Sequence, residues 1–215
     1  MHDAPRLYRD LVEAIAALAL DLPADSLAAV VPATPQWSVR QLIAHLAGGP
    51  ADAVADRMDG APGPSWTTRH VAEREGRAVA DLVEEMRANT DAVAASVEDN
   101  PRPAIVWDLA VHHADLHEAL GRGVPPEWSW SPVVHALAPM LLSKVPAEVH
   151  CGDATYGAGG PDVTVDPYEL FRVAFSRRSR AQVSRVFAGR VESALLDELP
   201  IFGPRDDDQP VPEAG

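Results

Sequence analysis

Apolar residues recur at helical spacing near the start of the chain. Positions three and four apart lie on the same face of a helix, so such a recurrence predicts an amphipathic helix with one buried face. The pattern covers residues 4–20. Its apolar stripe consists of Leu7, Leu11, Ile15 and Leu18.

The second helix is predicted from its starting signals. Ser38 and Gln41 have the spacing of a capping box. Trp37 and Leu42 occupy the two positions of a hydrophobic staple, so the helix is expected to begin at Val39.

Prolines and glycines divide the helical stretches from one another. Residues 21–36 contain three prolines and are expected to form a long connection. The Gly-Gly-Pro run at 48–50 predicts a bend or interruption in the second helix, and residues 60–64 predict a loop.

Two further helices complete the predicted bundle. An apolar stripe from residue 66 to about residue 97 predicts one long third helix. The fourth helix is expected at residues 104–120, followed by Gly121, which can adopt the left-handed conformation that ends many helices. Four helices joined by short links favour a helical bundle.

After residue 144 the pattern changes to short apolar runs typical of strands and short helices. We therefore predict an α+β protein with a helical bundle in residues 1–144 and a small α+β domain in residues 145–202. The tail, residues 203–215, has too few apolar residues to pack and is expected to be disordered. In the small domain we expect strands at 145–151, 162–165 and 182–188, and helices at 166–176 and 190–199.

Charge and composition exclude several partners. The formal net charge of −14 would repel phosphate backbones and anionic lipids, so nucleic acid is not an expected partner. No apolar run approaches the roughly 18 to 20 residues needed to span a bilayer, so no membrane partner is expected. The first residues do not have the basic-then-apolar order of a secretion signal, so a cytoplasmic location is expected.

A polar stripe on the fourth predicted helix is the main candidate for chemistry. Asp108, His112 and Asp115 are spaced by four and seven residues, which places them on one helix face between apolar neighbours. A metal ion is one partner that such a stripe could have. Because Cys151 is the only cysteine, the ligands would be histidines and carboxylates.

A third ligand would have to come from another helix, and His45 is the best candidate. It lies at the edge of the apolar stripe of its helix, so periodicity leaves its direction open. The alternative is a site without metal. Asp108 would then accept a hydrogen bond in the core, His112 would be a satisfied core histidine and His45 a surface residue.

Two separated stretches resemble a known family. TPQWSVRQLIAHLAG (residues 34–48) and WDLAVHHADLHEALGR (residues 107–122) resemble the signature stretches of the mycothiol-dependent maleylpyruvate isomerase family. That family belongs to the DinB-like (DinB/YfiT) four-helix bundles. The resemblance implies that His45, Asp108 and His112 hold a divalent metal, usually taken as zinc. The family commonly has Glu in place of Asp108, whose carboxylate reaches about 1 Å less.

The resemblance also suggests residues that bind the ligand. The family's second domain carries a G-R-R-S stretch that binds anionic groups, and this chain has Ser176-Arg177-Arg178-Ser179 in its place. Arg177, Arg178 and Asp115 are therefore candidates for binding a substrate or thiol. The alternative for the two arginines is a solvated basic face.

The resemblance implies a metal- and mycothiol-dependent isomerase or thiol S-transferase. The thiol would occupy the open metal position, and as a thiolate it would add to a small electrophilic substrate. In the isomerase reaction, rotation about the resulting single bond and loss of the thiol would give the trans product. The alternatives are a non-catalytic protein that binds a metal or ligand, and a structural bundle without metal. The sequence does not determine the oligomeric state.

Overall fold

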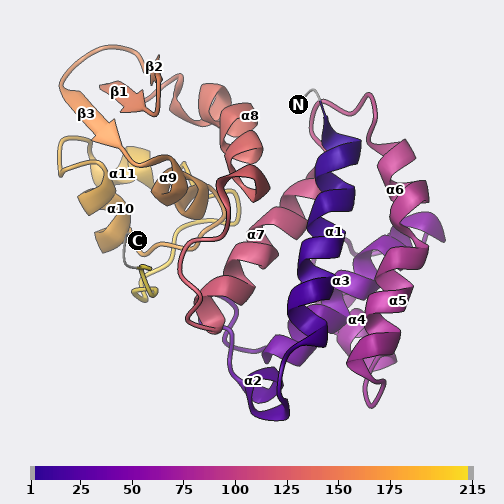
Figure 1. Cartoon of the computed structure of the whole chain (residues 1–215). Coiled ribbons are helices and arrows are strands. Elements are labelled where there is room, and N and C mark those ends of the chain that lie inside the picture. The colour runs from indigo at the N-terminus through magenta and orange to yellow at the C-terminus, as the bar shows by residue number, and fades with distance from the viewer. Residues whose placement is uncertain (1–2, 213–215) are drawn as a thin grey trace. The chain divides into compact units, whose positions relative to one another are not determined.

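The computed structural model describes residues 3–212 and confirms the α+β class (Figure 1). Contacts divide the chain into two compact units, one extending to Pro125 and the other formed by Pro126–Val211. The division therefore lies earlier than the boundary expected between residues 144 and 145, and helix α8 (Ser131–Leu142) belongs to the second unit. Each unit is described by itself.

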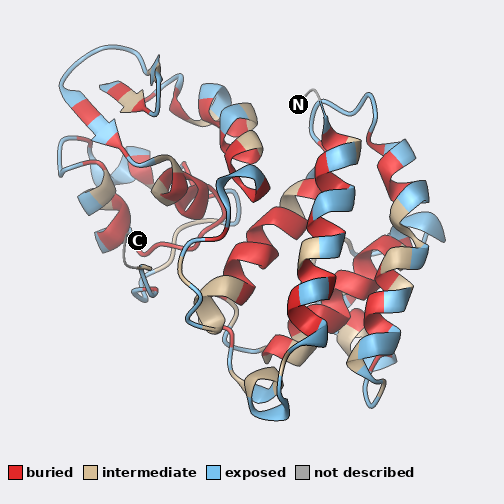
Figure 2. Cartoon of the chain, in the orientation of Figure 1, coloured by how far each residue is buried: buried red, intermediate tan, exposed pale blue. Residues whose placement is uncertain are grey.

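The first unit is a bundle of helices. Helix α1 packs against α5, α6 and α7, and helix α3 packs against α4, α5, α6 and α7. Figure 2 shows that buried residues dominate α3 and α7. The helices are α1 (Ala4–Leu20), α2 (Ala24–Ala28), α3 (Val39–Val54), α4 (Pro64–Glu73), α5 (Val79–Ala88), α6 (Thr90–Ser96) and α7 (Ala104–Ala119).

Helix α3 begins where its capping signals predict. The backbone N–H of Gln41 donates to the Ser38 hydroxyl over 3.3 Å, and the Ser38 N–H donates to the Gln41 side-chain oxygen over 2.9 Å. These bonds satisfy two N–H groups that the first turn would otherwise leave without a partner. The helix is not interrupted at residues 48–50, because it continues through this buried run to Val54, and of the two expected outcomes only a bend stays a prediction.

The expected long third helix at 66–97 was wrong. The chain forms three shorter helices, α4, α5 and α6. Gly76 has a positive φ of 74° in the first break, a conformation that glycine adopts without strain. At the second break the side chains of Asn89 and Thr90 donate to the carbonyl oxygens of Glu85 and Met86. Such side-chain bonds compete with the regular helical ones.

The second unit contains a small sheet with helices packed beside it. Within the described residues the strand order is β2-β1-β3, where β1 (Glu148–Cys151) pairs antiparallel with β2 (Ala154–Tyr156) and parallel with β3 (Asp162–Val165). The helices that follow are α9 (Pro167–Ala174), α10 (Arg180–Val186) and α11 (Ser193–Leu196). Trp130, Tyr168 and Phe171 pack against one another in its core.

Residues 182–188 are mainly helical, so the strand expected there was wrong. Ser179 and Gln182 form a second capping box that starts α10. Val183 and Phe187 are four residues apart and both buried, which is a helical spacing. Of the helix expected at residues 190–199, only α11 forms.

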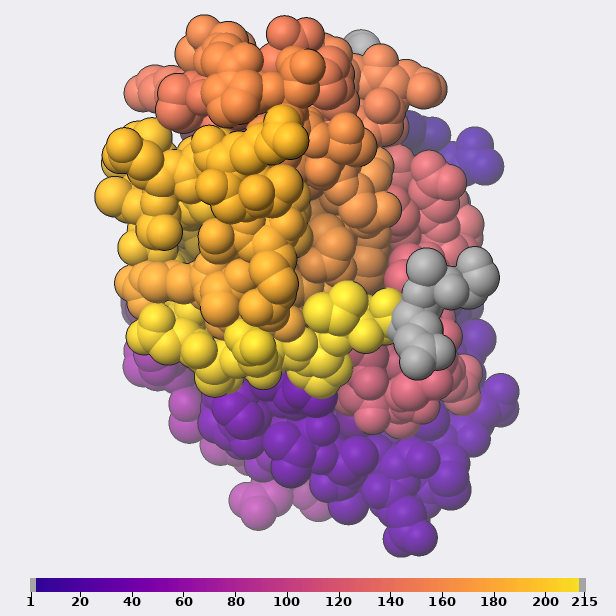
Figure 3. Space-filling view, turned by 90° about the vertical axis from the view of Figure 1, so that its left-hand side faces the viewer, coloured from indigo at the N-terminus to yellow at the C-terminus, as the bar shows by residue number. Residues whose placement is uncertain are grey.

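The described part of the tail is hydrogen-bonded rather than disordered. The backbone N–H of Arg180 donates to the Arg205 carbonyl over 2.8 Å, and Gln182 exchanges two hydrogen bonds with the backbone of Gln209. Figure 3 shows this yellow segment lying along the gold part of the chain. The expectation for residues 213–215 lies outside the described residues. Within residues 3–212, none of the helices is long and apolar enough to cross a membrane.

Candidate metal centre

Helices α3 and α7 bring His45, Asp108 and His112 together. His45 Nε2 lies 3.4 Å from Asp108 Oδ2, and His112 Nε2 lies 3.5 Å from Asp108 Oδ1. One ligand atom from each of the three residues can be chosen so that all lie within 4.8 Å of one another. Both histidines are buried, whereas the Asp108 side chain is 40 % exposed. The cluster therefore has one accessible side.

The separations fit a metal ion. Zinc–nitrogen and zinc–oxygen bonds of about 2.0–2.1 Å in a tetrahedron place neighbouring ligand atoms about 3.3 Å apart. The two separations, 3.4 and 3.5 Å, are close to that value, with each histidine facing a different oxygen of Asp108. Although Asp108 is one methylene shorter than Glu, its carboxylate reaches both imidazoles.

The charges at the cluster support one another. The partial burial of Asp108 opposes its ionisation, but the two neighbouring imidazoles hold the pKa of its carboxyl well below the ordinary value. Burial also opposes protonation of His112, but Asp108 and Asp115 outweigh it and raise the pKa of that imidazole. The same negative charges that favour a proton on His112 would favour a metal cation in its place.

Asp115 contacts His112 at Nδ1, the ring nitrogen that does not face Asp108. Its carboxylate lies 2.9 Å from His112 Nδ1 and is fully buried. A carboxylate that accepts from one ring nitrogen fixes the proton there and leaves the other nitrogen free to bind a metal. The sequence placed Asp115 on the correct helix face, and in the structure its carboxylate contacts His112. Its contact with a substrate or thiol stays a prediction.

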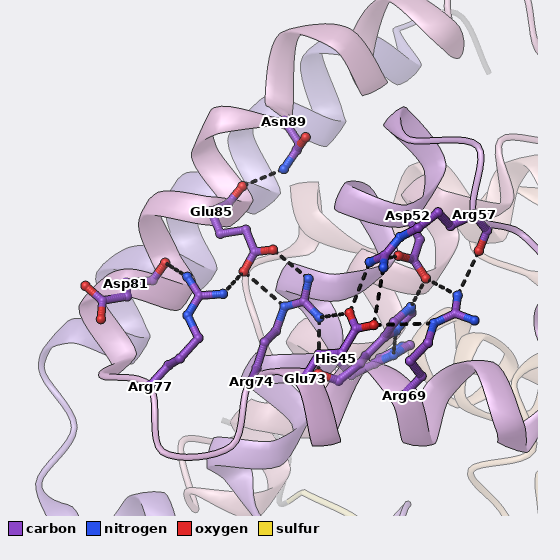
Figure 4. Close-up of polar contacts among 11 residues, drawn as sticks. His45, Asp52, Arg57, Arg69, Glu73, Arg74, Arg77, Asp81, Glu85 and Asn89 are labelled. Carbon is purple, nitrogen blue, oxygen red and sulfur yellow. Dashed lines mark hydrogen bonds and ion pairs between the residues drawn. The ribbon is translucent and has the colours of Figure 1, made fainter.

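A second series of buried contacts, which the sequence did not predict, supports His45. His45 Nδ1 lies 3.0 Å from His70 Nδ1, and His70 Nε2 lies 3.0 Å from Asp52 Oδ2. Burial and the neighbouring His45 lower the pKa of His70 to about 4. Asp52 pairs with Arg57 and Arg69 at 2.5 Å each, as the close-up of Figure 4 shows. The local sequence around His70 carries no motif that could have revealed this contact.

Aromatic side chains line the cluster. The ring centroid of Trp37 lies 5.0 Å from that of His45 and 6.4 Å from that of His112. Trp37, identified from the sequence only as a staple residue, is thus also a wall of the site. Tyr8 was missed as well: burial and the charge of Asp108 raise the pKa of its hydroxyl. Within residues 3–212 this buried hydroxyl has no hydrogen-bond partner.

Arg177 and Arg178 lie in the second unit and are buried, so the alternative of a solvated basic face was wrong. Two nitrogens of Arg178 donate to the Glu169 carboxylate, both over 2.7 Å. Arg177 donates to the Phe175 carbonyl over 2.7 Å. Ser176, which replaces the family's glycine, has a positive φ of 61°, the region that glycine favours.

Other candidate groups are less suited to chemistry. Cys151 is buried, and burial raises the pKa of its thiol to about 11, so it is a poor nucleophile. A second group of possible ligands, Glu148, His150 and Asp162, lies on the sheet of the second unit. Their side chains are 39 to 76 % exposed, and exposed acidic groups are common without any ion.

The bundle and its cluster of two histidines and one carboxylate define a candidate metal-binding helical protein. The family described as the mycothiol maleylpyruvate isomerase N-terminal domain matches residues 8–148, more than half of the chain. The chain therefore belongs to this family, as the two resembling stretches indicated. The matched region contains all three candidate ligands, and it makes this a mycothiol-dependent maleylpyruvate isomerase-like protein.

A solved structure supports the fold. The crystal structure of the mycothiol-dependent maleylpyruvate isomerase matches with a TM-score of 0.53 and 16 % sequence identity. The match covers 81 % of this chain and 88 % of that one. At this identity the likeness shows a shared fold. A search of curated proteins found no match.

Proposed function

We propose that this protein is a metal- and mycothiol-dependent isomerase or thiol S-transferase that acts on a small electrophilic substrate. His45, Asp108 and His112 would hold a divalent ion, zinc in the family. The observation that carries the proposal is the convergence of their three ligand atoms within 4.8 Å. The membership of the family supports the thiol and the reaction class.

The protein's own residues would hold the ion and leave room for a ligand. Three protein ligands leave a fourth tetrahedral position open, which is the arrangement of catalytic zinc sites. A divalent metal bound there would lower the pKa of a thiol, so that the nucleophilic thiolate forms at neutral pH. The partial exposure of Asp108 gives such a thiol a path to the cluster. Trp37 offers an apolar face beside it.

The proposal also gives roles to the other candidate residues, Asp115, Arg177 and Arg178. Asp115 would act through His112, because its carboxylate accepts from that ring and is fully buried. Arg177 and Arg178 stay predicted binders of an anionic group. The paired contact of Arg178 with Glu169 favours a structural part for that residue.

A second candidate function is a non-catalytic protein that binds a metal or a ligand. The departures from the family pattern at Asp108 and Ser176 favour it. It would keep the cluster and the bundle while the open position binds a ligand without chemistry. The two candidates differ in whether the bound thiol reacts.

One set of measurements separates the candidates. Purified protein is analysed for zinc, titrated with mycothiol, and assayed for maleylpyruvate isomerisation, alongside His112→Ala. The proposal predicts one zinc per chain, thiol binding and turnover, all lost in the variant. Full zinc occupancy without turnover would contradict the enzyme and favour the binding protein. A protein that holds no stoichiometric metal and binds no thiol would contradict both.

A further inference from the structure

We infer that Asp52 and His70 are positioning residues that keep the proton of His45 on Nδ1, so that Nε2 presents its lone pair to the metal site. This inference rests on the proposed function in taking His45 as a metal ligand. It adds two residues, from α3 and α4, that neither the sequence motifs nor the family description assigns.

The direction of the hydrogen bonds that join His45, His70 and Asp52 follows from the Asp52 carboxylate, which is the final acceptor. Asp52 is fully buried and pairs with the guanidinium groups of Arg57 and Arg69, so its carboxylate is ionised and only accepts. His70 Nε2, 3.0 Å away, must therefore carry the proton of that bond. His70 is itself fully buried, and burial favours its neutral form. A neutral ring with its proton on Nε2 has a lone pair on Nδ1.

The lone pair on His70 Nδ1 determines which ring nitrogen of His45 carries a proton. The two Nδ1 atoms lie 3.0 Å apart, a hydrogen bond that forms only when one of them carries a proton and the other does not. Since His70 accepts, His45 donates from Nδ1. The other ring nitrogen, Nε2, then faces Asp108 Oδ2 at 3.4 Å, inside the candidate cluster, where a metal cation would take the place of a proton.

The packing shows that this contact is built into the fold. A side chain at Gly48 would place its Cβ 2.5 Å from His70 Cγ and 2.6 Å from His70 Cβ, so the glycine is what lets the ring lie against α3. The rings of His45 and His70 meet edge to edge, with centroids 5.2 Å apart and planes inclined by 25°, and Trp66 packs edge-on against His70 at 4.2 Å. The ring of His70 is therefore held on two sides.

Both histidine ligands are then supported in the same way. His112 meets the Asp115 carboxylate directly, whereas His45 meets the Asp52 carboxylate through one additional imidazole. Support of this kind orients the ligand ring and sets its tautomer, and its loss commonly weakens metal binding by about 10- to 100-fold.

The tautomer of His45 in the metal-free protein tests the inference without any activity. Protein labelled with ¹⁵N in its histidines gives ring nitrogen shifts and two-bond proton couplings that identify which nitrogen carries the proton. In the wild type we expect the ring proton of His45 on Nδ1. In His70→Phe we expect this proton on Nε2. A wild-type His45 with its proton on Nε2 would overturn the inference.

Zinc affinity gives the second readout, measured by competition with a chromophoric chelator. We expect His70→Phe to bind zinc about 10- to 100-fold more weakly than wild type. His70→Asn places an acceptor oxygen near the position of Nδ1 and should recover most of the loss. A folded His70→Phe that binds zinc as wild type does would contradict the inference.

Two adjacent glycines provide a matched pair of variants. Gly48→Ala would push the His70 ring away and should weaken zinc binding as His70→Phe does. Gly49→Ala should leave it unchanged, because its Cβ would meet Trp66 at an ordinary 3.7 Å. Equal zinc affinities in the two folded variants would count against the inference. If His70→Phe and Gly48→Ala do not fold, the wild-type tautomer alone decides.

The two proposals can fail separately. A wild type that binds no zinc would refute the proposed function, while the tautomer of His45 would still report on Asp52 and His70. A wild type that binds zinc with His45 protonated on Nε2 before the metal is added would refute only the positioning role.

Discussion

Replacing Asp115 tests how strongly a buried carboxylate supports the candidate metal ligand His112. The carboxylate is fully buried and lies 2.9 Å from His112 Nδ1. Asp115→Asn keeps an acceptor oxygen but removes its charge. Asp115→Ala removes the acceptor and leaves the buried Nδ1–H without this partner.

The two variants should lose different amounts of zinc-binding free energy. A hydrogen bond to a charged group contributes about 1.5–3 kcal/mol, and a neutral one about 0.5–1.5 kcal/mol. The Asn variant should therefore lose about 1–1.5 kcal/mol of zinc binding, or roughly 5- to 10-fold in the dissociation constant. The Ala variant also bears the cost of a buried N–H without its acceptor, about 1–3 kcal/mol, and should lose about 10- to 100-fold.

The assay is chelator competition at fixed pH, with circular dichroism to confirm the fold. Asp91→Asn is the control, since it removes the same charge from a side chain that is 92 % exposed on α6. The reasoning would be refuted if Asp115→Ala folded and bound zinc as tightly as the control variant. It would also be refuted if Asn and Ala at position 115 gave equal losses.

Two further predictions concern stability. Burial and the neighbouring His117 lower the pKa of His113 to about 3, so below the ordinary histidine value of about 6.5 the unfolded chain binds a proton that the fold does not. Stability should fall as the pH drops from 6.5, by up to about 1.4 kcal/mol per unit for this residue. Urea unfolding of His113→Phe should show a shallower dependence, and an unchanged slope would contradict the assignment. Glu85→Ala should cost about 2 kcal/mol in the same assay, because the buried guanidinium of Arg74 loses its closer carboxylate and keeps only Glu73 at 3.7 Å; a loss below about 1 kcal/mol would show that the pair matters little.

The parts of the fold that the sequence predicted depend on local signals. The bounds of α1 follow from a single apolar stripe, and the start of α3 follows from the Ser38 capping box. The division of the third helix depends on Gly76 and on side-chain bonds from Asn89 and Thr90. Such bonds do not alter the hydrophobic pattern, so periodicity predicted one continuous helix.

Short segments were harder to assign. In residues 182–188, Val183 and Phe187 are the apolar side chains that become buried, and so short a run fits either a strand or a helix. The capping box formed by Ser179 and Gln182 was the available signal for a helix. The hydrogen bonds between Gln182 and Gln209 join residues far apart in sequence, so composition alone suggested a free tail.

The candidate site was predictable to the extent that it lies on one helix. Asp108 and His112 are one turn apart, so their spacing alone brings them together on α7. His45 comes from α3, where periodicity made it the best candidate but left its direction open, and the resemblance to the family assigned it as a ligand. The contact of His70 with His45 depends on how α4 packs on α3 at Gly48, a tertiary feature without a local signal.

Metal content tests the central claim most directly. The protein is loaded with zinc, freed of excess ion, and analysed by mass spectrometry for zinc per chain, beside His45→Ala and His112→Ala. We predict one zinc per chain in the wild type and less than stoichiometric zinc in both variants, with the fold retained. A wild type without zinc, or variants that keep a full equivalent, would contradict a metal centre at His45, Asp108 and His112.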